Sequence, residues 1–300
     1  MPVVDLDRIS KSYSSKAAVR ELSLRIEKGT MFGLLGPNGA GKTSTIRMMV
    51  GMTLPDSGTV RLFDEPFRRD MLARISYLPE ERGLYKRMKV IDQLIFMGQL
   101  HGLEASTAKA RARQWCERME ITESMEKKTQ ELSKGMQQKI QFIATLLHDP
   151  ELIIMDEPSS GLDPVNVSLL EQTLLELKGK GRTILFSTHR MEQVEKLCDA
   201  ICLVDQGRAV LEGTMRAVKS RYPRDRVVVE YEGDASFLTD PSITELRESP
   251  GRAEFKLRNG ANGQALLESA TRHARIFKFE LVEPSLEEIF IRTVGGRADA

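Results

Sequence analysis

The sequence predicts an α/β protein in which helices cover a mostly parallel sheet, followed by a small α+β domain. Three observations favour this class. A strand, a glycine-rich loop and a helix follow one another over residues 31–50. Strands and helices then alternate over residues 152–204, and the pattern changes again beyond about Thr214. Alternation of this kind is typical of parallel sheets whose strands are connected through helices.

The composition suits a folded protein with a filled core, since 41% of the 300 residues are hydrophobic and 29% are charged. The 44 basic residues nearly balance the 43 acidic ones, so the net charge gives no reason to expect a nucleic-acid partner. No apolar run approaches the roughly 20 residues of a membrane span, and the N-terminus lacks the pattern of a secretory signal. Cys116, Cys198 and Cys202 are expected to be buried thiols in a reducing cytoplasm, because they are too scattered for a disulfide framework.

The first half of the chain is expected to contain strands, one glycine-rich loop and an inserted group of helices. Residues 3–35 are predicted to form short strands, with a turn at Glu27-Lys28-Gly29 and a buried strand over Met31–Leu35. A helix should run from Lys42 to Val50. From about residue 90 to residue 131 the apolar spacing is helical, which predicts a helical subdomain at about 83–135.

The second half is expected to complete the sheet and then to form a separate domain. Apolar runs predict strands at 152–155, 183–187 and 200–204, with a helix between the first two that ends near Gly179. The first domain should therefore span residues 1–214. Residues 215–300 are predicted to form a C-terminal accessory domain, with strands at 227–231, 253–257 and 276–282 and a helix at 264–273. Ser285 and Glu288 form a capping box for a last helix.

The segment from Gly36 to Thr43 fits the phosphate-loop pattern Gly-x-x-x-x-Gly-Lys-Thr. Glycines allow successive backbone N–H groups to point at phosphate oxygens, and the helix N-terminus adds to this attraction. Lys42 is expected to contact the β- and γ-phosphates of ATP, and Thr43 to bind Mg²⁺. A plain turn with a helix cap is the alternative, which the strand before and the helix after make less favourable. The residues expected to bind nucleotide here are Gly36, Pro37, Asn38, Gly39, Ala40, Gly41, Lys42, Thr43 and Ser44.

Two adjacent carboxylates follow the buried strand at 152–155. Asp156 ends the strand, at the edge of a parallel sheet where ligands gather, and is expected to hold Mg²⁺ directly or through water. A lone aspartate in this place would more often be a helix cap or a turn residue. Glu157 changes this interpretation, because neighbouring side chains at a strand end point in different directions. One carboxylate can then hold the metal while the other polarises water.

Three further segments complete an ordered set. Leu132-Ser133-Lys134-Gly135-Met136 precedes the two carboxylates, whereas Ser160-Gly161-Leu162-Asp163 and His189 follow them. With the phosphate loop, this order and spacing resembles the ATP-binding subunit of an ABC transporter over residues 3–213. The resemblance implies a P-loop NTPase fold of the ABC ATPase type, in which the mostly parallel sheet is joined by an antiparallel β subdomain and the inserted helical subdomain.

The resemblance also implies roles for matching residues. Glu157 matches the general base and His189 the switch histidine that contacts the γ-phosphate. Tyr13 matches the aromatic residue that stacks on adenine, with an ordinary strand tyrosine as the alternative. The resemblance further implies residues that act in trans, on the nucleotide held by a partner copy: Ser133, Gly135 and Asp163. It also implies three metal ligands: Thr43, Asp156 and Glu80.

The chain departs from the family pattern at three positions. Lys134 replaces a glycine of the Leu-Ser-Gly-Gly-Gln signature, and Met136 replaces its glutamine, so that an amide donor is lost. Glu80 stands where the family usually has a glutamine. The stretch from Leu78 to Tyr85 is similar to one branch of exporters, associated with sodium or drug efflux, and so is Pro284–Phe290.

The implied function is that of an ATP-binding and ATP-hydrolysing subunit of an ABC exporter, with ATP and Mg²⁺ as its ligands. Its partners should be a second copy of the chain, or a paralogue, and separate transmembrane permease subunits. It should be cytoplasmic and peripheral at the cytoplasmic face of the membrane. Two alternatives stay open: a soluble ABC ATPase that acts on ribosomes or DNA, and a weakly active regulatory ATP-binding module.

Overall fold

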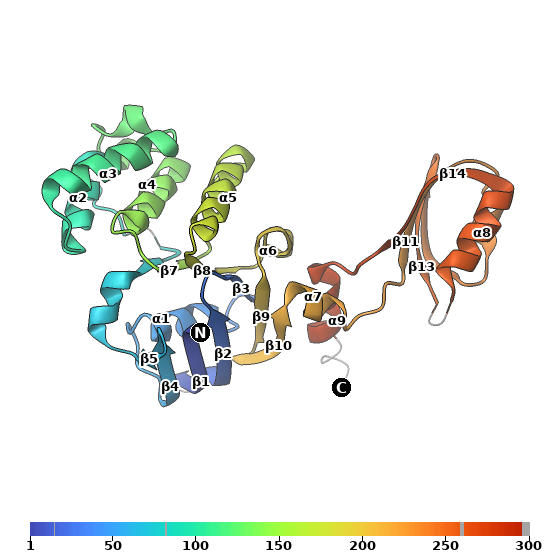
Figure 1. Cartoon of the computed structure of the whole chain (residues 1–300), viewed down its shortest axis with the longest axis horizontal. Helices are drawn as coiled ribbons and strands as arrows, with labels where there is room; N and C mark the ends of the chain where they lie inside the picture. Colours follow the sequence, from blue (N-terminus) through green and yellow to red (C-terminus); the bar gives the residue numbers. More distant parts are fainter. Residues whose placement is uncertain (15, 82, 259–260, 296–300) are drawn as a thin grey trace. The chain divides into compact units, whose positions relative to one another are not determined.

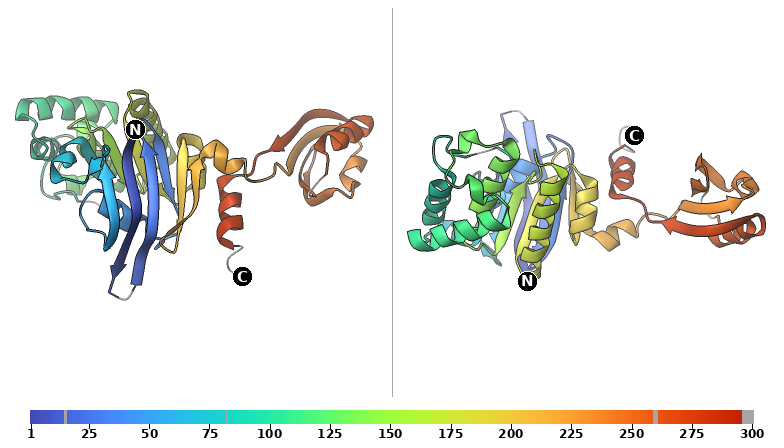
Figure 2. Two further views of the ribbon diagram at one scale, coloured as in Figure 1. Left: turned by 60° about the horizontal axis from the view of Figure 1, so that its bottom comes forward. Right: turned by 90° about the horizontal axis from the view of Figure 1, so that it is seen from above.

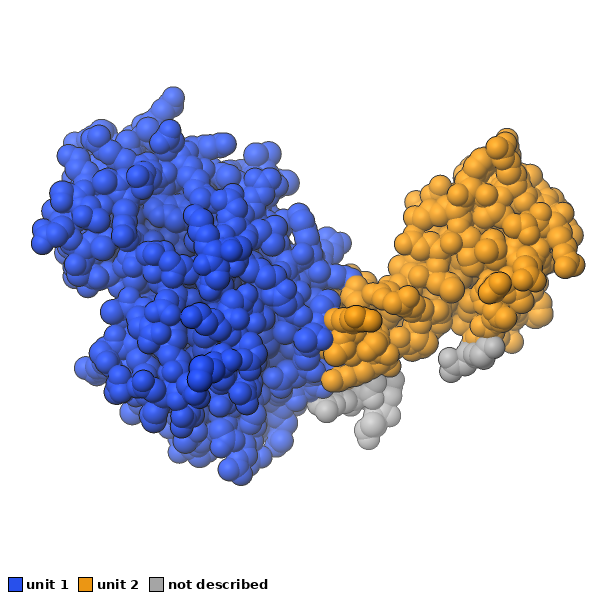
Figure 3. Space-filling model, viewed as in Figure 1, with its two compact units in different colours: residues 1–215 blue, residues 216–300 orange. Residues whose placement is uncertain are grey.

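A computed structural model of the chain describes residues 1–14, 16–81, 83–258 and 261–295. The chain divides into two compact units, residues 1–215 and 216–300 (Figure 3). The first unit contains two sheets and the second unit one, and each unit has its own cluster of buried apolar side chains. The two units are therefore described separately. No helix among the described residues is long and apolar enough to cross a membrane.

The first unit is built on a mostly parallel sheet, as predicted (Figure 1). All neighbouring strands run parallel except the last pair, β9 and β10. Among the described residues the strand order is β10-β9-β3-β8-β7-β6. The strands are β3 (Met31–Leu35), β6 (Ile75–Leu78), β7 (Leu152–Asp156), β8 (Thr183–Thr188), β9 (Ala200–Asp205) and β10 (Arg208–Thr214). The strand order brings the carboxyl ends of β3, β7 and β8 together, which is where the sequence analysis placed its candidate site.

A second, antiparallel sheet is formed mainly by the N-terminal residues. Its order within the described part of the chain is β2-β1-β4-β5, with β1 (Pro2–Tyr13), β2 (Lys16–Glu27), β4 (Ser57–Leu62) and β5 (Glu65–Pro66). The prediction of short strands was wrong here, since β1 and β2 have 12 residues each. Their pairing contains register shifts, and Arg8 and Glu21 adopt positive φ angles, so the regular alternation of buried side chains is interrupted. The sequence pattern therefore looked like several shorter strands.

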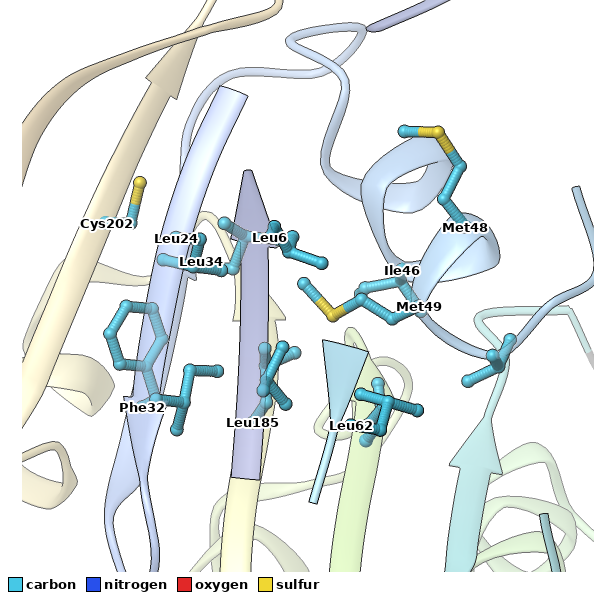
Figure 4. Close-up of a cluster of buried hydrophobic side chains, with 14 of the residues drawn as sticks. Leu6, Leu24, Phe32, Leu34, Ile46, Met48, Met49, Leu62, Leu185 and Cys202 are labelled. Atoms are coloured by element: carbon cyan, nitrogen blue, oxygen red, sulfur yellow. The ribbon is translucent and has the colours of Figure 1, made fainter. Parts of the chain in front are cut away.

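The helix α1 (Lys42–Met49) packs between the two sheets. Figure 4 shows Ile46 and Met49 of this helix beside Leu6 and Leu62 of the antiparallel sheet and Leu185 of β8. All these side chains are fully or almost fully buried. Because α1 follows directly on the glycine-rich loop, this packing fixes the loop relative to the central sheet.

The remaining helices of the first unit include the predicted helical group. In it, α2 (Val90–Leu100), α3 (Ala105–Arg118) and α4 (Lys134–Leu146) contact one another (Figures 1 and 2). Because α4 continues to Leu146 and also contacts β6, helical packing extends beyond residue 135. The other helical segments are α5 (Pro164–Gly179), α6 (Met191–Leu197) and the 3-10 turns Arg69–Arg74, Thr122–Ser124 and Thr129–Glu131.

The second unit is a small α+β domain, as predicted. Its described strands are ordered β12-β13-β11-β14 and are all antiparallel. The helix α8 contacts this sheet, and Leu266 and Ala270 of α8 pack with Val227, Val229 and Phe255 of the sheet. The elements are α7 (Met215–Lys219), which begins at the division, β11 (Arg226–Gly233), β12 (Ile243–Ser249), β13 (Arg252–Leu257), α8 (Gly263–His273), β14 (Ala274–Val282) and α9 (Leu286–Gly295).

Two local predictions in this unit are confirmed and one strand was missed. The sequence Ser249-Pro250-Gly251-Arg252 predicts a hairpin turn, and a turn through Pro250 and Gly251 connects β12 to β13. At the start of α9, the backbone N–H of Glu288 donates to Ser285 Oγ at 3.2 Å, and Glu288 Oε2 accepts from Ser285 N at 3.3 Å. The strand β12 was missed because most of its side chains are exposed, so it lacks the apolar alternation that indicates a strand.

Candidate nucleotide-binding site

A pocket of about 430 Å³ lies where the glycine-rich loop meets the ends of β7 and β8. This volume is in the range of small-molecule binding sites. The pocket combines residues from five separate parts of the sequence. The predicted residues that line it are Asn38, Gly39, Gly41, Lys42, Thr43, Ser44, Glu80, Asp156, Glu157 and His189.

The glycine-rich loop has the geometry of an anion-binding site. Gly41 adopts φ 110°, and a Cβ at this position would lie 2.4 Å from the carbonyl oxygen of Ala18. Only glycine fits there without a shift of β2. No side chain in the described part of the chain caps the N-terminus of α1, so its first backbone N–H groups stay available for a ligand.

Lys42 is buried within this loop. Its Nζ donates to the carbonyl oxygens of Gly36 at 2.7 Å and of Pro37 at 3.1 Å. Burial lowers the pKa of Lys42, while the carboxylates of Glu157, Asp156 and Glu80 act in the opposite direction. A bound phosphate would replace the two carbonyl contacts with charged ones, which are stronger.

Asp156 is held by two hydroxyl groups. Thr43 Oγ1 donates to Asp156 Oδ2 at 2.7 Å, and Ser187 Oγ donates to the other carboxylate oxygen. The contact between Thr43 and Asp156 joins the phosphate loop to the end of β7. Hydroxyl and carboxylate oxygens are hard ligands of the kind that Mg²⁺ prefers. Among the described residues no group of three or more His, Cys, Asp or Glu side chains could hold a metal ion by itself.

Glu157 lines the same pocket, but its backbone conformation and its hydrogen-bond partners differ from those of Asp156. It adopts φ 50°, a left-handed conformation that is uncommon for residues other than glycine. Its Oε1 lies 2.9 Å from Nδ1 of His189, and its Oε2 accepts a hydrogen bond from Thr188 Oγ1 at 3.2 Å. The Glu157 side chain is 11% exposed, whereas His189 is 63% exposed at the pocket edge. The two adjacent carboxylates therefore have separate hydrogen-bond partners. This agrees with the prediction that their side chains point in different directions.

Glu80 reaches the pocket on the segment that follows β6. The amide Nε2 of Gln141 on α4 donates to the carbonyl oxygens of Pro79 and Glu81, both at 3.1 Å. This pair of hydrogen bonds fixes the backbone on either side of Glu80. Arg82, which belongs to the motif from Leu78 to Tyr85, lies outside the described residues.

Other predicted residues lie beside the pocket. Pro37 and Ala40 line a neighbouring hollow of about 280 Å³, which also borders Asn38 and Gly39. Tyr13 ends β1 at the hairpin with β2; it is 42% exposed and does not line the main pocket. Its predicted contact with adenine stays a prediction.

The residues predicted to act on a partner's nucleotide lie elsewhere. Ser133 is the N-cap of α4, and its Oγ accepts from the backbone N–H of Met136 at 3.2 Å. Asp163 caps α5 through the backbone N–H of Asn166 at 3.0 Å. A Cβ on Gly135 would lie 3.5 Å from Gly161 O, so the two motif segments are neighbours. None of Ser133, Gly135 and Asp163 lines the pocket of its own chain, so their predicted role in trans stays a prediction.

Four residues at the site escaped the sequence analysis. Ser187 and Thr188 hold the two carboxylates, and Lys16 and Ala18 of β2 line the pocket. The two hydroxyl residues end β8 directly before His189, so the strand-end argument applied to Asp156 could have found them. Lys16 and Ala18 have no spacing signal. The three cysteines are buried free thiols, as expected.

Comparison with known proteins agrees with this geometry. A family model described as ABC transporter matches residues 19–160, and a model described as the C-terminal domain of DrrA1-3-like ATP-binding proteins matches residues 213–294. The chain is 42% identical to the ABC transporter ATP-binding protein YhaQ of Bacillus subtilis (strain 168), over 98% of its own length and 99% of the relative. The chain belongs to the ABC transporter ATP-binding proteins.

Two further matches within this family are informative. The Nod factor export ATP-binding protein I of Paraburkholderia xenovorans (strain LB400) is 33% identical, and the match covers 97% of each chain. The solved structure of an ATP-binding subunit of an ABC transporter superposes with a TM-score of 0.68 at 26% identity, over 73% of this chain and 92% of that one. The candidate pocket thus belongs to a member of a family of ATP-binding proteins.

Proposed function

We propose that this ABC ATP-binding protein hydrolyses ATP at the pocket and drives export through separate membrane subunits. The observation that carries the proposal is the arrangement around Asp156 and Glu157. One carboxylate contacts the phosphate loop through Thr43, and the other contacts His189. Phosphoryl transfer depends mainly on positioning and on charge stabilisation, and these residues provide both.

The residues present fit a magnesium ion. The hydroxyl of Thr43 and the carboxylates of Asp156 and Glu80 would hold it, with Glu80 as an additional anionic ligand. Three carboxylates line the pocket beside Lys42, so a polyphosphate would be repelled without a cation between them. When bound, Mg²⁺ neutralises charge on the phosphate oxygens.

The chain's own residues perform the remaining steps. The phosphate loop and Lys42 hold the β- and γ-phosphates in place. Glu157 accepts a proton from the attacking water, because its carboxylate lines the pocket and is kept in position by Thr188 and His189. His189, exposed at the pocket edge, contacts the γ-phosphate.

The site is completed by a second protomer. Ser133, Gly135 and Asp163 lie outside their own pocket and stand at the starts of α4 and α5. In a two-fold arrangement they would face the nucleotide of the partner copy, or of a paralogue, so that ATP joins the two chains. Hydrolysis removes the shared γ-phosphate, and the dimer then loosens and moves the membrane subunits at the cytoplasmic face of the membrane.

The direction of transport is outward in this proposal. Support comes from the relative named for Nod factor export and from the C-terminal model named after DrrA1-3-like proteins. Residues 1–214 would be the motor domain, with its helical subdomain at about 83–135, and residues 215–300 an accessory domain. The segments Leu78–Tyr85 and Pro284–Phe290 support the branch associated with sodium or drug efflux.

The test is the substitution Glu157→Gln. Glutamine keeps the size of the side chain but cannot take up the proton, so steady-state ATP hydrolysis should fall at least about a hundredfold, while the affinity for ATP is retained. The matched control is Glu192→Gln, the same change on an exposed residue of α6 that lies outside the pocket. Hydrolysis at the parental rate by Glu157→Gln would contradict the proposal.

A further inference from the structure

A chain of buried polar side chains joins α5 and α6 to the turn that follows Glu157. Ser159 Oγ donates to Gln193 Oε1 at 3.2 Å, and Gln193 Nε2 donates to Glu171 Oε1 at 3.4 Å. At the outer end, Lys196 Nζ donates to Glu171 Oε2 at 2.7 Å. Ser159, Gln193 and Glu171 are exposed by only 1%, 6% and 7%, and these three described residues do not line the pocket. The proposed chemistry therefore leaves their role open.

The direction of these hydrogen bonds is fixed. Buried polar groups destabilise a fold unless each has a partner. The carboxylate of Glu171 can only accept, so the amide group of Gln193 has to present its Nε2 to Glu171 and its Oε1 to Ser159. Gln193 therefore has one orientation, in which its oxygen is directed at the Ser159 hydroxyl.

The turn formed by residues 157–160 is held from two sides. A hydrogen bond of 3.1 Å between the backbone groups of its first and last residues closes it. Its two central residues are Pro158 and Ser159. The carbonyl oxygen of Pro158 accepts from Gln138 Nε2 on α4 at 3.1 Å, and the Ser159 hydroxyl contacts Gln193 on α6. Each central residue is thus fixed by a different helix.

Gln193 also belongs to the helix that follows His189. Because α6 begins two residues after His189, one glutamine joins this helix to the turn after Glu157. The contact of 2.9 Å between Glu157 Oε1 and His189 Nδ1 therefore depends on the distance between the turn and α6. Glu157 needs such support, because its uncommon left-handed backbone persists only where the surrounding structure maintains it.

We infer that Gln193 and Ser159 are positioning residues for Glu157, an inference that rests on the proposed function. They hold the turn so that the carboxylate of Glu157 stays beside His189 and the attacking water. Glu171 acts through Gln193, whose amide group it orients. A displacement of about 1 Å at a reacting group can lower a rate by about a hundredfold. The contact should therefore affect hydrolysis much more than ATP binding, which the phosphate loop provides.

The first test removes each side of the contact. In Gln193→Ala and in Ser159→Ala, kcat for ATP hydrolysis should fall at least about tenfold, while KM for ATP should change by less than about twofold. The control is Thr173→Val, which removes a buried hydroxyl that donates to Leu169 O within α5. Its kcat should stay at the parental value. An unchanged kcat in both variants, or an equal fall in the control, would overturn the inference.

An exchange of two side chains distinguishes positioning from a general loss of packing. In Gln193→Glu two carboxylates face each other and the amide donor is lost, so kcat should fall. The double variant Gln193→Glu with Glu171→Gln places the carboxylate on α6 and the amide on α5. A donor then faces an acceptor again, and the Ser159 hydroxyl keeps an acceptor. Its kcat should recover most of the parental value, and a double variant as slow as Gln193→Glu would contradict the assignment.

Hydrogen–deuterium exchange provides a measurement that does not depend on hydrolysis. In the nucleotide-free, full-length protein, the amides of residues 158–163 should exchange at least about tenfold faster in Gln193→Ala than in the parental protein or in Thr173→Val. If the parental protein does not hydrolyse ATP, the proposed function fails, and hydrogen exchange alone decides whether Gln193 holds the turn. If the parental protein hydrolyses ATP but Gln193→Ala leaves kcat or exchange unchanged, only the positioning role fails.

Discussion

At the scale of the residue, Glu157 carries most of the proposed chemistry, and its backbone conformation explains how. The left-handed φ of 50° costs roughly 1 kcal/mol for a residue with a Cβ. In return, the side chain turns away from that of Asp156 and reaches Thr188 and His189. Two neighbouring carboxylates can then have separate tasks, one beside the phosphate loop and the other beside the attacking water.

A second residue gives a testable dependence of stability on pH. His148 stacks on His101 with ring centroids 3.8 Å apart, and its Nε2 lies 3.0 Å from the carbonyl oxygen of Ile75. Burial, and then the neighbouring His101, lower the pKa of His148 from 6.5 to about 4. As pH falls from 6.5 to 4, the unfolded chain binds a proton that the folded protein resists, so the free energy of unfolding decreases through this interval.

The measurement is urea denaturation at the two ends of this pH interval, for the parental protein and for His148→Gln. Glutamine keeps an N–H donor for the carbonyl oxygen of Ile75 and does not titrate. The variant should therefore lose less stability than the parental protein as pH falls. A parental and a variant protein with the same pH slope would exclude His148 as the source of the acid sensitivity.

The sequence predicted the site residues that belong to a motif and missed those that depend on strand pairing. Lys42, Thr43 and Asp156 were found because spacing alone identifies the phosphate loop and the strand end. Ser187 and Thr188 contact the carboxylates only because β8 lies beside β7 in the sheet. Whether β8 lies beside β7 depends on the order of the strands in the sheet, and a sequence motif gives no information on that order.

At the scale of the element, the turn between β9 and β10 supports the phosphate loop. The backbone N–H of Gly207 donates to Ala40 O at 2.8 Å, and Gly207 O accepts from the backbone N–H of Arg20, also at 2.8 Å. Gly207 has φ 80°, and a Cβ there would lie 2.8 Å from Ala18 O. The turn is thus wedged between β2 and the loop, with no room for a side chain.

Gly207→Ala should therefore weaken nucleotide binding. The control is Gly181→Ala, because Gly181 has nearly the same φ of 81° and a Cβ there would meet nothing within 4 Å. Both changes carry a similar backbone cost of about 1 kcal/mol, but only the first displaces the turn that holds the loop. Titration calorimetry with ATP should show a higher Kd for Gly207→Ala than for the control. Equal affinities in the two variants would mean that the turn does not support the loop.

The elements that the sequence predicted best are those with apolar runs or clear helical periodicity. The strands β3, β7, β8 and β9 are buried on both faces, so each appears as a continuous apolar run. By contrast, β1 and β2 contain bulges and β12 is mostly exposed. Each of these segments forms a single strand because it pairs with a neighbouring strand. The apolar pattern of the sequence does not reveal that pairing.

At the scale of the whole molecule, the proposed motor requires two chains. The Glu157→Gln protein should form dimers when ATP and Mg²⁺ are present, because the nucleotide is bound but not hydrolysed. Removal of Mg²⁺ with EDTA should return it to monomers, since the charge of three pocket carboxylates would then act directly on the phosphates. Light scattering coupled to size-exclusion chromatography measures both states.

The control for this prediction is Lys42→Ala in the same background, which removes the cation from the phosphate loop and should stay monomeric in all conditions. A Glu157→Gln protein that remains monomeric with ATP and Mg²⁺ would contradict the shared site. The same experiment in the presence of an added paralogue distinguishes a pair of identical chains from a mixed pair.

The helix α4 has a consequence for how two such sites would take turns. Ser133 caps its N-terminus. Further along, Gln138 Nε2 donates to Pro158 O at 3.1 Å, and Gln141 fixes the loop of Glu80. In the proposed dimer, α4 would therefore connect Ser133, beside the partner's nucleotide, with Glu80, which lines the pocket of its own chain. Release of phosphate from one site would then displace α4 and so affect the other site. This favours ATP hydrolysis at the two sites in turn over simultaneous hydrolysis.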